Sequence, residues 1–237
     1  MQPGRSLLLI ADIGGYTRYM STHRMSLAHA EVNTARLLET VVDAAPGFEL
    51  IEIEGDAAFL SRRADASGPG EAVQATVRAA VAMHRAFHLE RRYVSAYLCP
   101  CHGCAQVDDL HLKFVAHVGD VATQTIRQRR KLVGIDVIHV HRMLKNPVDV
   151  PEYVLFSEAL YGSAATSMPA QEVAQDLEGI GPVRSYFVDL ADVAEPAPVP
   201  ADPSLVARLG RTLAVAGAGM PYMLGLRRRR RPAAAAG

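Results

Sequence analysis

Two aspartates each follow a short apolar run and lie beside glycine, a pattern that suits divalent-cation binding. Asp12 ends the run LLLIAD ahead of Gly14 and Gly15, and Asp56 follows Gly55 in the segment LIEIEGDAAFL. Mg²⁺ in proteins usually takes one or two carboxylates and completes its shell with water and substrate phosphates. The pair therefore predicts a Mg²⁺ or Mn²⁺ site for a phosphoryl substrate, although a carboxylate at a turn can also simply cap that turn.

A second group of candidate ligands is the segment CPCHGC, which contains Cys99, Cys101, His102 and Cys104. A structural zinc ion takes four nitrogen or sulfur ligands, so His102 or His111 would have to complete a set of three thiolates. The spacing lacks the paired Cys-x-x-Cys knuckles of strong zinc motifs. Zinc binding, reduced surface thiols and a redox disulfide are therefore all retained as interpretations.

Hydrophobic periodicity indicates which elements position these residues. Alternation of apolar and polar residues favours strands, and apolar residues at helical spacing favour amphipathic helices. Gly55 permits a tight hairpin turn that places Asp56 at its tip. Strands are expected at 7–12, 50–54, 57–61, 111–121, 152–157 and 183–190, helices within 18–45 and at 71–90, 134–144 and 158–161, and a basic loop at 123–131. His117 is expected to be a packed or hydrogen-bonded strand histidine and not a catalyst.

Composition limits the class of protein. The chain has 237 residues with 25 acidic and 25 basic side chains, so net charge does not point to a polyanionic partner. Three cysteines and no N-terminal secretion signal predict a protein of the reducing cytoplasm.

The C-terminal region has a different composition. A proline-rich linker is expected at 194–203, followed by an apolar and arginine-rich tail at 204–237 that includes Arg227–Arg231. The longest uncharged run of this tail, Thr212–Leu226, is shorter than the ~20 residues of a spanning helix. The tail is expected either to lie on an anionic inner membrane face or to be a disordered, solubilising segment. It lacks the interleaved aromatics of a nucleic-acid reader.

Five segments, taken in order, resemble the catalytic domain of class III adenylyl and guanylyl cyclases. They are IADIGGYT, IEIEGDAAFL, LKFVAHVGDV, GIDVIHVHRML and LEGIGPVRSYFV, over about residues 7–190. The cysteine-containing insertion at 91–110 and the motif HRMLKN are similar to a bacterial cyclase-like subfamily with no assigned function. The resemblance implies an α+β domain over 1–193, with a ferredoxin-like, mixed but mainly antiparallel sheet and helices on one face. It also implies a site shared by two subunits, hence a homodimer or pairing with another cyclase-like chain.

The resemblance also implies roles for individual residues. Asp12 and Asp56 match the metal aspartates, with the Ile13 carbonyl as a backbone ligand, and Arg142 matches the arginine that stabilises charge on phosphate in the transition state. The loop residues Gly14, Gly15, Tyr16 and Thr17 would approach the nucleotide. Glu52 matches the purine-reading position, where guanylyl cyclases have Glu, and Lys131 stands at its partner position.

Several family positions are altered. Ile138 replaces the transition-state asparagine, and Glu178 replaces the phosphate-binding lysine. Lys131 stands where the family has Asp or Cys, so Glu52 and Lys131 are expected either to pair with each other or to face outward. Loss of one preorganised donor commonly costs ~10²–10³ in rate, so a conventional cyclase with these residues would be very weak. Lys145 or the basic segment Arg127–Lys131 would have to compensate.

Three hypotheses remain open at this stage. The first is a regulatory, signalling or dimerisation module that binds metal and nucleotide without efficient cyclase activity. The second is an active nucleotidyl cyclase, a phosphorus–oxygen lyase that makes cGMP or cAMP from GTP or ATP. The third is a zinc-stabilised scaffold whose cyclase site is vestigial.

Overall fold

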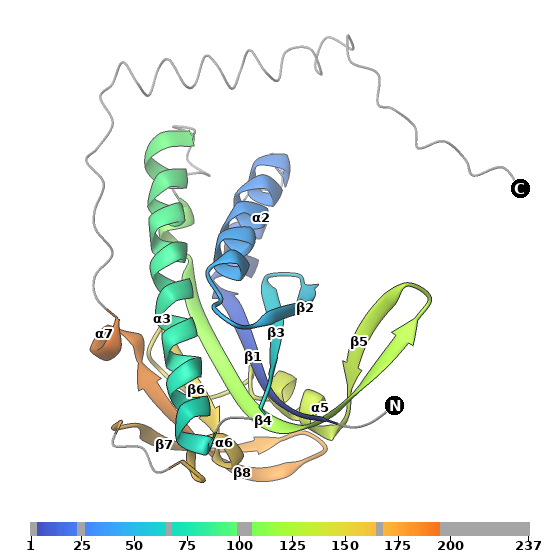
Figure 1. Cartoon of the computed structure of the whole chain (residues 1–237). Helices are drawn as coiled ribbons and strands as arrows, with labels where there is room; N and C mark the ends of the chain where they lie inside the picture. The colour runs from blue at the N-terminus through green and yellow to red at the C-terminus, as the bar shows by residue number, and fades with distance from the viewer. Residues whose placement is uncertain (1–3, 23–26, 65–67, 99–105, 165–167, 195–237) are drawn as a thin grey trace, which may run out of the picture.

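A computed structural model describes residues 4–22, 27–64, 68–98, 106–164 and 168–194 (Figure 1). The described chain forms one twisted eight-stranded sheet with helices packed on it. The strands are β1 Gly4–Gly14, β2 Glu49–Glu54, β3 Ala57–Arg63, β4 His111–Ile126, β5 Arg129–Val133, β6 Tyr153–Ser157, β7 Gln171–Leu177 and β8 Gly181–Asp189. The helices are α1 Tyr16–Thr22, α2 Leu27–Asp43, α3 Pro69–Tyr93, α5 Ile135–Arg142, α6 Glu158–Tyr161 and α7 Leu190–Val193, with short turns at Val94–Leu98 and Gln106–Asp109.

The sheet is mixed and mainly antiparallel, as predicted. Its strand order is β2-β3-β1-β4-β6-β8-β7, and β5 pairs with the far end of β4. The β4–β6 pair is parallel and the other pairs are antiparallel. Because β1 and β4 lie at the centre, the ends of these two strands meet the tip of the β2–β3 hairpin, where Asp12 and Asp56 lie.

Both faces of the central strands are buried. In β1, Leu7 and Leu9 belong to the core under α2 and α3, whereas Leu8 and Ile10 face a second core that includes Val140 of α5. This explains the continuous apolar run at the start of the chain, since a strand covered on both faces has no polar side. The helix expected at 134–144 is present as α5, but it packs against the opposite face, so the helices do not all lie on one face as expected.

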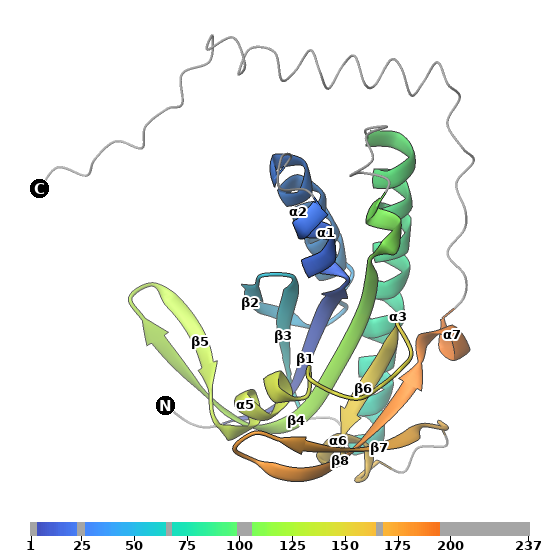
Figure 2. The same cartoon turned by 180° about the vertical axis from the view of Figure 1, so that it is seen from behind.

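The expected basic loop at 123–131 is wrong. β4 continues to Ile126, six residues beyond Asp120, and β5 pairs back on it, so that the two strands project from the body as an arm (Figures 1 and 2). Arg127 makes the reversal with a positive φ of 58°. Thr123 and Thr125 favour a strand, but the clustered arginines obscured their alternation.

The predictions missed one further strand, β7. Only two of its seven residues are buried, so it lacks a clear apolar face at the sheet edge. The expected linker and tail, 195–237, lie outside the described residues, and the domain boundary at 193 stays a prediction. Among the residues that the structure describes, no helix has both the length and the apolar content to cross a membrane.

Candidate functional site

Asp12 and Asp56 come together at one end of the sheet because β1 pairs with β3. Asp12 lies opposite Ala57, the residue that follows Asp56, and the Ile13 amide donates to the Asp56 carbonyl oxygen at 3.1 Å. Gly55 makes the turn between β2 and β3 with a positive φ of 67°, a conformation that glycine adopts without steric cost. The backbone of the two aspartates is therefore held in a fixed relation by ladder and turn hydrogen bonds.

The two carboxylates interact electrostatically. Partial burial raises the pKa of Asp56, and the negative charge of Asp12 raises it further, while a backbone hydrogen bond and Lys113 act in the opposite direction. Two neighbouring carboxylates repel each other, and a bound cation reduces this repulsion. The donor set of two carboxylates beside a backbone segment fits a hard divalent cation such as Mg²⁺ or Mn²⁺.

Lys113 is a site residue that the sequence reasoning did not find. It lies opposite Asp12 in the β1–β4 ladder, and its Nζ is 3.1 Å from Asp12 Oδ2. The side chains of Lys113 and Asp12 are 26% and 16% exposed, so the ion pair is partly shielded from water. Alternation placed Lys113 on the same strand face as His117, but only the strand register shows which acid it meets.

The loop after β1 is closely packed. Gly15 has φ +83°, and a Cβ at this position would lie 3.1 Å from the Asp109 carbonyl oxygen. A side chain is thus disfavoured by backbone strain and by a close contact. Tyr16 lines a cavity of about 550 Å³ together with apolar residues that include Leu50 and Ile53. The nucleotide-binding roles of Gly14, Gly15, Tyr16 and Thr17 stay predictions.

Glu52 and Lys131 form an ion pair, as one of the two interpretations of these residues predicted. Lys131 Nζ lies 3.0 Å from Glu52 Oε2, and a second pair joins Arg130 to Glu49 at 2.5 Å. Both pairs bridge β2 and β5 beside a cavity of about 490 Å³. Two of the four cations of the basic segment, Arg130 and Lys131, are therefore paired with acids of the same chain.

Arg142, the predicted transition-state residue, is also paired within the chain. It lies at the end of α5 and its guanidinium donates to the Glu178 carboxylate. Ile138, one turn earlier on the helix, is 49% exposed and offers no hydrogen bond. Arg142 thus meets Glu178, the acid that the resemblance predicts at the lysine position of the cyclase family.

The candidate zinc ligands are only partly described. Cys99, Cys101, His102 and Cys104 lie outside the described residues, so their metal binding stays a prediction. His111 begins β4 opposite Gly14 and lines a small cavity of about 190 Å³.

His117 has the structural role expected for it. It is 2% exposed, its Nδ1 contacts Ser157 Oγ at 2.8 Å and its Nε2 contacts Asp136 Oδ1 at 2.9 Å. Ser157 is itself 1% exposed, so a substrate cannot reach this hydroxyl. A Cβ on Gly119 would overlap Asp136, so glycine is required for this carboxylate to approach the strand. The cluster joins α5 to the sheet.

The motif HRMLKN has a clear structural role at Asn146. The Asn146 amide donates to the Met143 carbonyl at the end of α5, and its Oδ1 accepts from Val148 N–H and Tyr153 O–H. Tyr153 lies beside Lys113 in the sheet, since Phe114 pairs with Val154. Asn146 therefore links the end of α5 to the strand row that contains Asp12 and Lys113.

Comparison with known proteins gives both a family and a fold. Residues 34–153 match the family described as "Protein of unknown function (DUF2652)". The Mycobacterium tuberculosis protein "Uncharacterized protein Rv2561/Rv2562" is 38% identical over 197 residues, which cover 82% of this chain and 90% of that protein.

Two solved structures show the likeness in fold. The guanylate cyclase domain of RhGC from Catenaria anguillulae, in complex with GTP, has a TM-score of 0.58 at 17% identity and covers 79% of this chain and 98% of that one. A class III adenylyl cyclase-like ATP-binding protein from Pseudomonas aeruginosa has a TM-score of 0.57 at 17% identity and covers 69% of this chain and 35% of that one. At such identities the likeness concerns the fold alone. The chain therefore belongs to the DUF2652 family, and its fold is that of the class III nucleotidyl cyclase catalytic domain.

Proposed function

We propose that this chain is a nucleotide-binding module of the cyclase fold that holds a divalent cation on Asp12 and Asp56 and has little or no cyclase activity. The observation that carries the proposal is the contrast between two halves of the site. Asp12 and Asp56 are close enough to interact electrostatically, which supports a shared cation, whereas Arg142 is paired with Glu178.

The metal half of the site supports ligand binding. A divalent cation held by Asp12, Asp56 and the Ile13 carbonyl would supply positive charge for a triphosphate. Lys113 lies 3.1 Å from Asp12 on the same end of the sheet and is positioned to add a second cation for phosphate oxygens. The loop Gly14–Thr17 brings backbone amides to the same strand end.

The other half of the site lacks the means to stabilise a transition state. The transition-state donor position holds Ile138, and the family lysine position holds the acid that neutralises Arg142. Glu52, at the position that reads the purine, is paired with Lys131, so a base must break this pair before it can be read. Binding with slow or absent turnover follows from this combination.

Exposed apolar residues support a homodimer. Val32 of α2, Leu50 and Ile53 of β2 and Ile126 at the end of the β4–β5 arm are 41–56% exposed. The arm projects beyond the sheet while two ion pairs tie β5 to β2, and its end is available to a second subunit (Figure 2). Sedimentation velocity should show a dimer that Ile53→Asp and Ile126→Asp convert to a monomer. A wild-type monomer at micromolar concentration refutes this part of the proposal.

The test of the nucleotide function separates binding from turnover. The full chain is titrated calorimetrically with GTP or ATP in the presence of Mn²⁺, and cyclic nucleotide is quantified in parallel against an Asp56→Ala control. We expect metal-dependent binding that Asp12→Ala and Asp56→Ala abolish, with product at the level of the control. Failure to bind nucleotide with Mn²⁺ present refutes the proposal.

An active cyclase is the second candidate, and Lys113 is the observation that favours it. This lysine supplies a cation in place of the missing family lysine, and Glu52 favours GTP as the substrate. Cyclic nucleotide well above the Asp56→Ala control, and lost in Asp12→Ala, would establish this function and replace the first proposal.

A further inference from the structure

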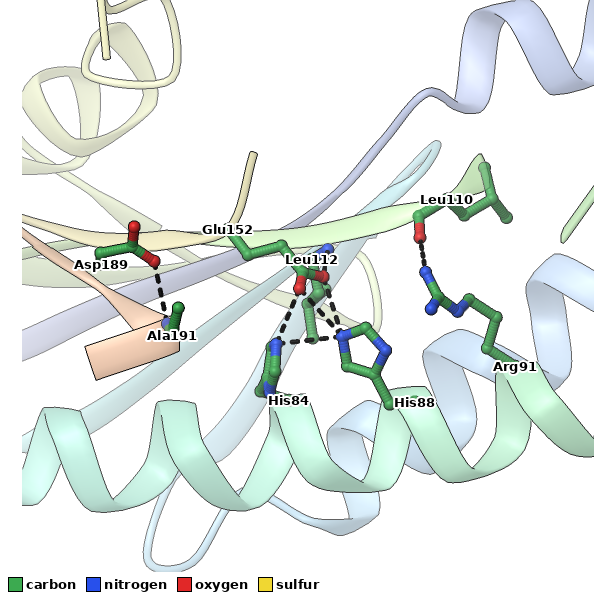
Figure 3. A network of polar contacts seen from close by, with 8 residues as sticks. All are labelled: His84, His88, Arg91, Leu110, Leu112, Glu152, Asp189 and Ala191. Atoms are coloured by element: carbon green, nitrogen blue, oxygen red, sulfur yellow. Dashed lines mark hydrogen bonds and ion pairs between the residues drawn. The ribbon is translucent and has the colours of Figure 1, made fainter. Parts of the chain in front are cut away.

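A second group of potential ligands lies on the opposite face of the sheet. His84 and His88 of α3 and Glu152, just before β6, direct one ligand atom each to a common point (Figure 3). All three atoms lie within 4.8 Å of one another. Because Phe114 pairs with Val154, Tyr153 lies beside Lys113 and Glu152 lies beside Leu112. Successive residues along a strand face opposite sides of the sheet, so the side chains of Glu152 and Tyr153 point to opposite faces.

The geometry of the three side chains is close to that of a metal site. His84 Nε2 is 2.9 Å from Glu152 Oε2, His88 Nε2 is 2.9 Å from Glu152 Oε1, and the two Nε2 atoms are 3.0 Å apart. Ligand atoms about 2.0–2.2 Å from a tetrahedral zinc ion are roughly 3.3–3.6 Å from each other. An outward shift of a few tenths of an ångström would admit the ion.

Hydrogen bonds alone do not use this arrangement well. An imidazole nitrogen has one in-plane direction for a proton or a lone pair. His88 Nε2 lies within 3.0 Å of both Glu152 oxygens and of His84 Nε2, so its single direction cannot make a well-aligned hydrogen bond to all three atoms. A cation at the common point would satisfy all three groups at once.

The scaffold fixes the ligands in advance. His84 and His88 are four residues apart on a 25-residue helix, the spacing that places two histidines on one face in helical zinc motifs. The Glu152 carboxylate accepts the Leu112 amide at 2.9 Å, and its backbone carbonyl accepts the Leu190 amide at 3.1 Å. Such outer contacts orient a ligating carboxylate.

Charge and access also suit a cation. The Glu152 carboxylate places one acid beside two imidazoles, a donor set that suits a divalent cation. The three side chains are 15–18% exposed, which leaves a route for an ion and for water.

We propose that His84, His88 and Glu152 form a binding site for a divalent transition-metal ion, with Zn²⁺ as the ion that best suits two imidazoles and one carboxylate. Water would complete the shell. The residue after His84 is Arg85, where the hydrolytic zinc motif His-Glu-x-x-His has its glutamate base, so the chain does not supply that base. The ion would join α3 to the start of β6, directly behind the strand row of Asp12 and Lys113.

The experiment must separate this site from the cysteines. The full chain carrying Cys99→Ser, Cys101→Ser and Cys104→Ser is freed of metal with a chelator and titrated with Zn²⁺ alone at neutral pH against a chromophoric competitor. We expect one tight equivalent. His88→Gln and Glu152→Gln should each weaken binding by more than about tenfold, since even outer-shell changes cost about 10–100-fold.

A matched control comes from another histidine of the chain. His141 of α5 also contacts a glutamate, with Nε2 3.1 Å from Glu54 Oε2, but this pair belongs to no described metal cluster. His141→Gln should leave zinc affinity unchanged. A folded serine variant that binds no zinc, or equal affinity in His88→Gln and the parent, overturns the proposal.

Folding is checked by circular dichroism of the metal-free proteins. If a glutamine variant does not fold, X-ray absorption at the zinc edge of the serine protein decides the question. Two imidazoles per zinc support the site. A zinc coordination shell without imidazole overturns it, because both histidines of the proposed site would then be absent from the shell. Among the described residues, no other group of three ligands converges in this way.

Discussion

Replacement of Lys113 by methionine should strengthen the binding of a divalent cation by the nucleotide-free protein. Lys113 Nζ lies 3.1 Å from Asp12 Oδ2, so the ammonium occupies the neighbourhood that a cation must enter. Methionine keeps most of the aliphatic volume and removes the charge. A cation approaching Asp12 then meets two acids without the opposing charge of the lysine.

The magnitude follows from the exposure of the pair. Two unit charges 4 Å apart interact by about 1 kcal/mol in water and about 4 kcal/mol at an effective dielectric constant of 20. The pair lies between these limits, because the Lys113 and Asp12 side chains are 26% and 16% exposed. Lysine is flexible and can turn away, which lowers the cost of displacing it. We therefore expect a gain of about 1–2 kcal/mol, or about 5–30-fold in affinity.

Mn²⁺ is the appropriate probe, since the free ion is counted directly by electron paramagnetic resonance. Wild type and Lys113→Met are titrated at pH 7.5, with Lys131→Met as the control. Lys131 is also a lysine in an ion pair, at 3.0 Å from Glu52, but it lies on β5 of the projecting arm. The control should bind Mn²⁺ as wild type does.

The same variant should act in the opposite direction on nucleotide. Once the ion binds Asp12, Lys113 is free to contact phosphate oxygens, so Lys113→Met should weaken Mn²⁺–GTP binding by about tenfold. Equal or weaker Mn²⁺ affinity in Lys113→Met refutes competition at Asp12. Tighter binding that survives in the Asp12→Ala, Lys113→Met double variant shows that the ion lies elsewhere.

Three further predictions concern stability and charge. Asp56→Asn should stabilise the metal-free protein at neutral pH by about 0.5 kcal/mol in urea unfolding, and it should abolish Mn²⁺ binding. The raised pKa of Asp56 means that its ionised form is disfavoured in the folded protein, and the gain is small because solvent screens part of the repulsion. Glu178→Lys should tighten triphosphate binding by about tenfold in calorimetry, since it frees Arg142 and adds a cation, yet turnover should stay low because Ile138 is unchanged. Burial, and then the charge of His117, lower the pKa of His139 to about 4. Between pH 6.5 and 4 the unfolded chain therefore binds more protons than the folded chain, so the stability of the fold decreases as the pH falls through this range. His139→Gln should remove about 1 kcal/mol of this loss in unfolding curves measured at several pH values.

The sequence was informative where local pattern and chemistry coincide. Asp12 and Asp56 each stand at the end of an apolar strand beside glycine, and the hairpin and strand bounds were predicted closely. The turn at Gly55 needs a positive φ, which glycine signals directly. Their mutual approach was expected from the order of the resembling segments, and the register of β1 with β3 is consistent with it.

Several contacts between distant segments could not be predicted from the sequence. Lys113 meets Asp12 only because β4 pairs with β1 in one particular register, and a shift by one residue would turn its side chain to the other face. Glu152 meets His84 and His88 across 64–68 residues. β7 was missed because few of its residues are buried at the sheet edge.

Breaking the ion pairs of the candidate site costs less free energy than the loss of a transition-state donor. Arg142–Glu178 and Lys131–Glu52 are both substantially exposed, with Glu178 78% exposed and Lys131 44% exposed. Exposed pairs contribute about 0–1 kcal/mol each, so a triphosphate can break both at a cost of about 1–2 kcal/mol, or roughly tenfold in affinity. A missing transition-state donor costs more, about 10²–10³ in rate, and no rearrangement of Ile138 can restore it. The same substitutions are therefore expected to weaken nucleotide binding modestly and turnover severely, as the proposed binding module requires.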